Sequence, residues 1–172
     1  MYRNVYSIRR SFIVPYSIVV FLFVVLLLLS LFWRGYHLER VLLGVLIVPV
    51  LYVFLESVFR KVKTGEQGMM IVKLFRKKEF SWQNITHIGA VILRKKVYLL
   101  LTTVRGFYIL SYAYDNFSSL VQDIVEHVDT EKVEEDVRKQ VDHPVKNISD
   151  IIMTWFTVVI LIGIISMKLF IP

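Results

Sequence analysis

The stretch FIVPYSIVVFLFVVLLLLSLFW, at residues 12–33, is twenty-two residues long and carries no charge. A helix rises about 1.5 Å per residue, so this stretch spans roughly 33 Å, enough to cross a hydrocarbon core of about 30 Å. Three arginines precede it, as in a secretory signal peptide, but it is too long for one and no small-residue cleavage pattern follows. The sequence therefore predicts a retained membrane-spanning helix.

Two further apolar stretches predict two more spans. The second covers residues 41–59 and contains Pro49, which predicts a kinked or tilted helix. Glu56 lies four residues before Arg60, which predicts an ion pair on one helix face; the alternative is a buried or partner-facing role for Glu56. The third covers residues 150–172, because Lys168 can extend its long side chain to the headgroups. Its small or weakly polar residues favour close helix packing in lipid: Thr154, Thr157, Gly163 and Ser166.

The overall composition agrees with a membrane protein that carries one modest soluble domain. Of the 172 residues, 56% are hydrophobic, compared with about 45–50% in soluble domains. The chain contains no cysteine, which excludes disulfides, a thiol nucleophile and a thiolate metal site. The expected organisation is an N-terminal tail and transmembrane hairpin at residues 1–59, a soluble domain at 60–149 and the third span.

The basic residues predict how the chain is oriented. The N-terminal tail has three arginines and no acid, and the stretch after the second span opens with Arg60, Lys61 and Lys63. Because lysine and arginine near span ends stay cytoplasmic, the tail and the soluble domain are expected on the cytoplasmic side of the inner membrane. The connector at 34–40 and the C-terminus are then expected outside.

Between the second and third spans the pattern changes to that of short strands. A turn at 64–68 is followed by alternating apolar residues, clearest at 97–104 and 107–114, with short polar breaks. About five antiparallel strands are expected, in a curled sheet. Apolar residues at helical spacing then predict a C-terminal helix that closes the sheet and continues through 129–142. The predicted fold class is therefore α-helical membrane plus α+β soluble.

The string FSWQNI at 80–85, two predicted hairpins and a helix after Tyr114-Asp115-Asn116-Phe117 together resemble bacterial PH-like domains. The resemblance covers about residues 68–128. It implies a curled sheet closed by a helix. The chain departs from the family pattern in having about five predicted strands where a full PH barrel has seven, and in having Trp82 in a predicted strand. The resemblance also implies a membrane-anchored adaptor or binding module that performs no catalysis.

Charge divides this region into a basic sheet and an acidic helix. Residues 60–105 hold eleven basic and two acidic residues, a balance of +9; residues 106–149 hold four basic and nine acidic residues, a balance of −5. Seven cations in or beside two hairpin loops form the candidate binding patch: Lys73, Arg76, Lys77, Lys78, Arg94, Lys95 and Lys96. Such a patch fits an acidic protein partner or anionic headgroups, and the alternative is that the loops are charged for solubility and edge protection.

The direction in which the strands run distinguishes an acidic protein partner from anionic headgroups. If the first strand follows a short linker after the second span, both loops point away from the bilayer, which favours a protein partner. An extra strand at 60–63 would reverse that polarity.

Residue patterns typical of catalysis are not found. The four histidines lie in different predicted elements without metal-ligand spacing, and the sequence has no phosphate loop, G-x-S-x-G or H-E-x-x-H motif. No cofactor or nucleic-acid partner is expected. The expected function is an accessory or scaffold subunit that contacts membrane lipids and a protein complex. The alternatives are a sensor of anionic lipid headgroups and, ranked last, a membrane enzyme using Glu56 and His37.

Overall fold

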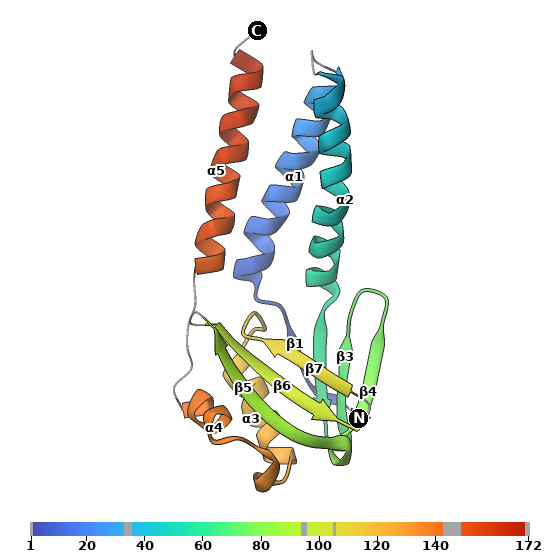
Figure 1. Cartoon of the computed structure of the whole chain (residues 1–172), viewed down its shortest axis with the longest axis vertical. Helices are drawn as coiled ribbons and strands as arrows, with labels where there is room; N and C mark the ends of the chain where they lie inside the picture. The colour runs from blue at the N-terminus through green and yellow to red at the C-terminus, as the bar shows by residue number, and fades with distance from the viewer. Residues whose placement is uncertain (1, 33–35, 94–95, 105, 143–148, 171–172) are drawn as a thin grey trace. The chain divides into compact units, whose positions relative to one another are not determined.

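The computed structural model describes residues 2–32, 36–93, 96–104, 106–142 and 149–170 (Figure 1). The chain divides into two compact units. One contains residues 1–9 and 59–147, and the other contains residues 10–58 and 148–172. The soluble domain is therefore discontinuous in sequence, because the first two apolar helices are inserted near its N-terminus.

The helical unit contains three helices among the described residues, and each is long and apolar enough to cross a membrane. They are α1 (Arg10–Phe32), α2 (His37–Phe59) and α5 (Ser149–Phe170). All three predicted spans are present as helices. Each begins one to four residues before its predicted start, because polar residues join the first turn: Arg10 and Ser11, His37, Glu39 and Arg40, and Ser149.

Large aliphatic side chains make the contact between α1 and α5. Val19 and Leu26 of α1 form a buried cluster with Val158 and Leu161 of α5. The small residues expected to mediate helix packing lie elsewhere on α5: Thr154 and Ser166 are half-buried, and Thr157 and Gly163 are exposed. A Cβ added at Gly163 would meet no atom within 4 Å, so this glycine does not permit a close approach to α1 or α2.

An ion pair joins the start of α2 to the end of α5, between Glu39 and Lys168, two partly buried side chains. We expect Glu39→Lys to lower the stability of the helical unit by about 1–3 kcal/mol, between the values for exposed and buried pairs. Thermal unfolding in detergent, followed by Trp155 emission in a background without the other two tryptophans, measures this. The swap Glu39→Lys with Lys168→Glu should restore the midpoint, and Glu66→Lys should leave it unchanged. Equal thermal midpoints for all of these variants would show that the Glu39–Lys168 ion pair does not stabilise the helical unit.

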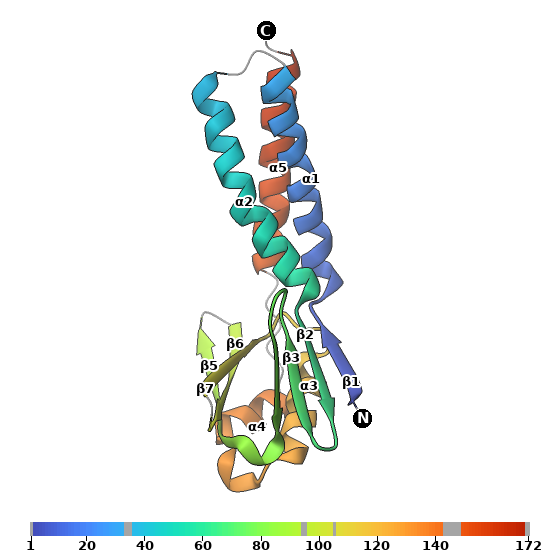
Figure 2. The same cartoon turned by 90° about the vertical axis from the view of Figure 1, so that its right-hand side faces the viewer.

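The first sheet of the domain is antiparallel and contains four strands in sequence order (Figure 2). They are β1 (Tyr2–Ser7), β2 (Lys61–Gly65), β3 (Gly68–Val72) and β4 (Lys77–Ser81). At one end of this sheet Ser7, Lys61, Val72 and Lys77 pair successively across the four strands.

Residues 2–7, expected to belong to an N-terminal tail, form a strand, and the extra strand that the sequence left open at 60–63 is present as β2. Residues 2–7 and 61–65 are neighbouring strands. In β2, Val62 and Thr64 are buried while Lys61 and Lys63 point to the outer side. The two lysines, interpreted as an orientation signal, also form the outer face of an alternating strand.

The second sheet has the order β5 (Ile85–Leu93), β6 (Lys96–Thr103) and β7 (Gly106–Ser111). The alternation at 97–103 is confirmed, because Val97, Leu99, Leu101 and Thr103 are all buried on one face. Trp82 was expected in a strand but belongs to the short 3-10 helix η1 (Trp82–Asn84). The described residues form seven strands in two sheets, where about five in one curled sheet were expected.

The helix α3 (Phe117–His127) buries the predicted apolar face, including Leu120, Val121 and Ile124. It does not continue through 129–142 as expected. A 3-10 turn, η2 (Thr130–Lys132), and a separate helix, α4 (Glu135–Asp142), follow it. Between them Val133 forms a bridge with Ile88, and the Glu134 N–H donates to the Ile88 carbonyl at 3.0 Å. This segment covers an edge of β5, and the interruption of the helix makes that contact possible.

At Gly68, the first residue of β3, the backbone of β4 lies so close that only glycine fits. A Cβ there would lie 2.3 Å from the Phe80 carbonyl oxygen and 2.8 Å from the Ser81 Cα, both backbone atoms. We expect Gly68→Ala to destabilise the domain by about 1–3 kcal/mol, because β3 and β4 must separate. At Gly89 the added Cβ meets only the flexible Glu134 side chain, so Gly89→Ala is the matched control with a smaller effect. Urea unfolding followed by Trp82 emission measures both, and equal effects would contradict this account.

Candidate functional site

Tyr114 organises the end of the domain at which the chain leaves for α1 and returns from α2. Its side chain is fully buried. On the α1 side, the Arg9 backbone N–H donates to the Ala113 carbonyl at 2.9 Å. The Nε of the Arg9 side chain donates to the Tyr114 carbonyl at 3.0 Å. Ile8 also forms a bridge with Tyr114. We call this end of the domain, at residues 7–9, 60–61 and 112–115, the junction end.

Arg60 reaches the same tyrosine from the α2 side. Its Nε donates to the Tyr114 hydroxyl at 3.0 Å, its Nη2 donates to the Ile109 carbonyl at 3.2 Å, and its guanidinium carbon lies 5.7 Å from the ring centroid. The predicted Glu56–Arg60 pair on one helix was wrong, because α2 ends at Phe59 and the Arg60 guanidinium binds within the domain. The segment that leads into α1 and the segment that follows α2 thus both bind the same buried residue, Tyr114.

The first group of predicted site residues lies on the hairpin between β3 and β4. The Lys73 N–H donates to the Arg76 carbonyl at 2.8 Å, which closes the turn, and Phe75 at its tip is 82% exposed. Its cations are all exposed: Lys73, Arg76, Lys77 and Lys78. The Lys78 ammonium lies 5.5 Å from the centroid of the Tyr108 ring. We call residues 73–78 the basic hairpin.

The basic hairpin lies at the junction end. Val72 and Lys77 pair across its base, and Val72 also pairs with Lys61 at the start of β2. The expectation that this loop points away from the segments joined to the spans was therefore wrong. The cause is the extra strand β2, which reverses the direction of every later strand in the sheet.

The structure places only part of the second predicted group. Arg94 and Lys95 lie outside the described residues, and Lys96 is the half-buried first residue of β6. Next to it, the Tyr112 N–H donates to the Val97 carbonyl at 3.0 Å. The start of β6 therefore also lies at the junction end.

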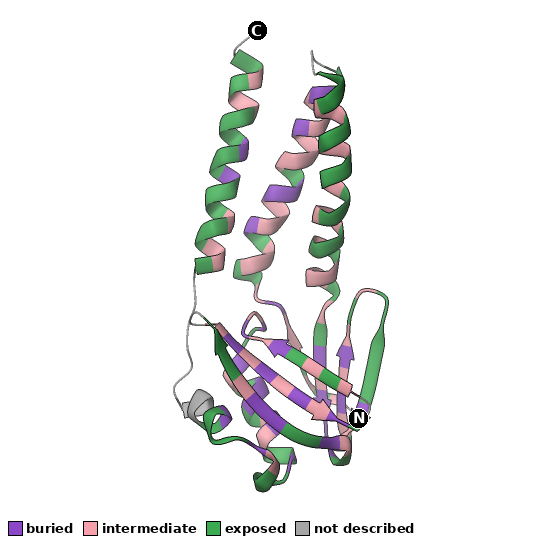
Figure 3. Cartoon of the chain, in the orientation of Figure 1, coloured by how far each residue is buried: buried purple, intermediate pink, exposed green. Residues whose placement is uncertain are grey.

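The outward face of the second sheet is apolar and uncovered within the described part of the domain. In β7, Phe107 is 80% exposed and Ile109 is 54% exposed, while Leu110 is buried. Figure 3 shows exposed and buried residues interspersed along the strands of this domain. The cross-strand partner of Ile109 is Leu100, and that of Tyr98 is Val91, so these side chains share one face. We call Val91, Tyr98, Leu100, Phe107 and Ile109 the apolar face.

A polar cluster around Asp123 of α3 holds β1 and β2 in place. Its carboxylate accepts hydrogen bonds from the Asn4 Nδ2 at 2.9 Å, from the Tyr6 hydroxyl at 3.2 Å and from the Thr64 hydroxyl. Burial raises the pKa of Asp123, but these hydrogen bonds outweigh it and bring the pKa below its ordinary value. Burial and the nearby Asp123 charge raise the pKa of Tyr6 to about 12, so its hydroxyl remains a donor.

Two of the three described histidines, His87 and His127, have ordinary structural partners. His127 stacks on Trp82 with ring centroids 4.8 Å apart and contacts the Asp123 carbonyl through Nδ1 at 2.7 Å. His87 pairs with Glu134 at 2.9 Å on the surface. His37 is exposed at the start of α2, and His143 lies outside the described residues. In the part of the chain that the structure describes, no three His, Asp or Glu side chains form a metal-binding group.

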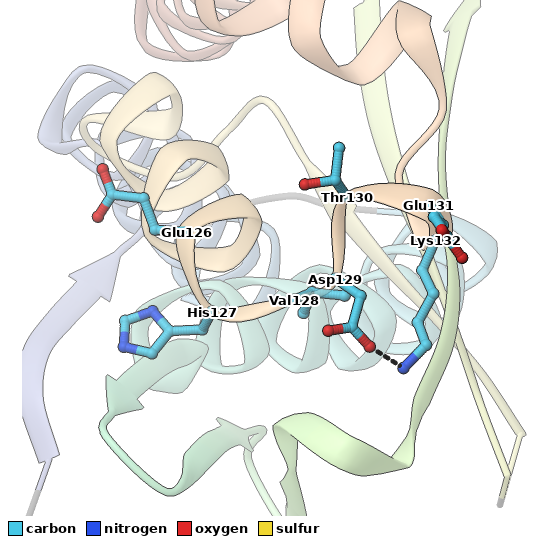
Figure 4. Close-up of a pocket in the computed structure, with 7 residues that line it drawn as sticks. All are labelled: Glu126, His127, Val128, Asp129, Thr130, Glu131 and Lys132. Atoms are coloured by element: carbon cyan, nitrogen blue, oxygen red, sulfur yellow. Dashed lines mark hydrogen bonds and ion pairs between the residues drawn. The ribbon is translucent and has the colours of Figure 1, made fainter.

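A pocket of about 560 Å³ lies at the end of α3, lined by residues 126–132. Figure 4 shows Glu126 and His127 at one side of it and Glu131 and Lys132 at the other. Within it, Asp129 forms an ion pair of 2.7 Å with Lys132. Since its carboxylates do not converge, the pocket offers no arrangement for acid–base or metal chemistry.

Two features of this end of the domain were missed from the sequence. Phe75 was overlooked because the sequence alone does not distinguish an exposed aromatic residue at a turn from an aromatic residue buried in a strand. The pairing of Arg9 and Arg60 with Tyr114 joins residues far apart in the chain, and no local pattern encodes it. No family model matches this sequence, and no curated protein or solved structure shows a significant match to it.

Proposed function

We propose that this chain is a non-enzymatic integral membrane protein that acts as an accessory or scaffold subunit and binds a protein partner through the apolar face. The observation that carries the proposal is the exposure of Phe107 and Ile109 on a sheet face that no described element covers. Exposed apolar patches rimmed by polar residues are typical of protein-interaction sites on monomers. Burial against a partner would remove this area from water, which is favourable.

The helices and charges support an inner-membrane location with the domain on the cytoplasmic side. Because β1 pairs with β2, residues 2–7 and 61–65 must lie on one side of any membrane that α1 and α2 cross. Arg3, Arg9 and Arg10 lie before or at the start of α1, and Arg60, Lys61 and Lys63 follow α2, which favours the cytoplasm. A third span then leaves the C-terminus outside.

The arrangement of strands supports the PH-like assignment. Sheets of four and three antiparallel strands, followed by a helix that packs its apolar face on them, agree with the seven strands and closing helix of a PH-like domain. The domain departs from a simple PH-like chain in having two helices inserted between its first and second strands. With the return of the chain to α5, such an insertion would join the domain to the membrane at three points of the chain instead of two.

A photocrosslinking residue at Ile109, in the full chain in native membranes, tests the proposed function. We expect a crosslinked product with a protein of defined mass at this position. The matched control is the same residue at Val5, which is 57% exposed on β1 and lies outside the apolar face. The variant Phe107→Glu should abolish the Ile109 product without changing the Trp82 emission of the purified chain. Crosslinks at both positions alike, or at neither, would contradict the proposal.

A further inference from the structure

We infer that the basic hairpin inserts Phe75 into the interface of a bilayer containing anionic lipids. The inference rests on one part of the proposed function, that α1 and α2 span the membrane, and not on the partner at the apolar face. Its basis is the combination of an exposed aromatic tip, a group of exposed cations that form no ion pair with any described residue, and a short covalent path to the apolar helices.

The chemistry of the hairpin fits a membrane interface. Phe75 is 82% exposed at the tip of a turn closed by the Lys73–Arg76 backbone hydrogen bond. Among the described residues, none of the cations Lys73, Arg76 and Lys77 forms an ion pair. The nearest acid in sequence, Glu79, accepts a hydrogen bond from the Tyr2 hydroxyl. Aromatic rings and long cationic side chains are the residues that bind the headgroup region.

The covalent path limits how far the hairpin can lie from the helix ends. Lys61 is two residues from Phe59, the last residue of α2, so their Cα atoms are at most about 7 Å apart. Lys77 lies two strands from Lys61, which adds about 10 Å at the usual strand spacing. The base of the hairpin is therefore within about 17 Å of the end of α2.

Charge favours anionic lipid over a zwitterionic surface. The junction end also contains Arg9, Arg60 and Lys61, and the stretch from 67 to 78 contains no acid. Each lysine or arginine near an anionic leaflet strengthens binding about fivefold at physiological salt. A soluble acidic protein would satisfy the same cations, but it would not account for an exposed aromatic residue at the tip of a hairpin that is joined to α2 by so short a covalent path.

The chain lacks cysteine, so a single introduced thiol can be labelled without altering other positions. We suggest Phe75→Cys, with Val104→Cys as the matched control, each carrying an environment-sensitive fluorophore. Val104 is 73% exposed in the turn between β6 and β7, where its N–H donates to the Asn84 carbonyl. The full chain is placed in nanodiscs of phosphatidylcholine, with or without phosphatidylglycerol.

We expect the label at 75 to shift to shorter wavelength and to be quenched by doxyl lipids when phosphatidylglycerol is present, while the label at 104 remains in water. Replacing Lys73, Arg76 and Lys77 with glutamine should lower the docked fraction about fivefold per cation. A label at 75 as exposed as that at 104 overturns the inference, as does equal shielding in both lipid mixtures. A chain that does not incorporate into nanodiscs overturns both the inference about the basic hairpin and the assignment of α1 and α2 as membrane spans. The crosslink at Ile109 tests the protein partner separately, so its failure would leave the result for the hairpin unaffected.

Discussion

Tyr114→Ala is expected to lower the free energy of unfolding of the soluble domain by about 3–5 kcal/mol, the range for truncating a buried aromatic residue. The substitution removes a fully buried ring, the acceptor of the Arg60 Nε hydrogen bond and the surface beneath the Arg60 guanidinium. The measurement is urea unfolding of the full chain in detergent, followed by Trp82 emission after replacing Trp33 and Trp155 with phenylalanine. Trp82 is the only tryptophan of the soluble unit.

Tyr114→Phe is the control for this substitution. It keeps the ring and removes only the hydroxyl, so we expect a loss of about 1 kcal/mol, the usual value for one hydrogen bond. An alanine variant that unfolds at the same urea concentration as the phenylalanine variant would show that Tyr114 does not organise the junction end.

Asp123→Ala is expected to lower the free energy of unfolding of the domain by about 3 kcal/mol, because hydrogen bonds to a charged group contribute about 1.5–3 kcal/mol each and this site is partly solvated. The loss affects three donors at once, on Asn4, Tyr6 and Thr64. It should release β1 first, so protease cleavage near the N-terminus should accelerate together with the shift in the urea midpoint. Gln122→Ala, at the exposed neighbouring position of α3, should change neither.

The same carboxylate makes the domain sensitive to acid. The pKa of Asp123 is lowered in the folded state by the hydrogen bonds it accepts, so its contribution is complete above the unfolded pKa of about 4. That contribution is lost as the pH falls through the lowered folded value. We expect the urea midpoint of the wild type to fall below pH 4 more steeply than that of Asp123→Asn. If the urea midpoints of the wild type and of Asp123→Asn fell equally with pH, the role of the Asp123 carboxylate in acid sensitivity would be contradicted.

The parts of the fold that could be predicted from sequence are those with a long, uninterrupted period. The spans are continuous apolar runs, residues 97–103 alternate without a break, and α3 repeats apolar residues at helical spacing. In each case a single buried face determines the local pattern. For that reason the three apolar helices, the hairpins of the second sheet and the face of α3 are all present in the structure.

The parts that were missed depend on contacts between distant segments. In β1 and β2, half of the side chains face outward and several are basic, so the inward alternation is only two or three residues long. Their pairing partner lies beyond two helices, as in the pair of Val5 with Lys63. The position of the basic hairpin at the junction end followed from these strands, so it was missed with them.

The central claim is that residues 2–7 and 61–65 form neighbouring strands of one domain on the same side of the membrane. Because Val5 and Lys63 are directly paired, their Cα atoms lie within the range that a disulfide can bridge. The most direct test is oxidation of Val5→Cys/Lys63→Cys in native membranes, followed by a gel-shift assay with a polyethylene-glycol maleimide. We predict that the double variant resists the reagent until it is reduced, while Val5→Cys/Gln83→Cys is modified at both thiols throughout. Modification of Val5→Cys/Lys63→Cys at both positions before reduction would contradict the claim.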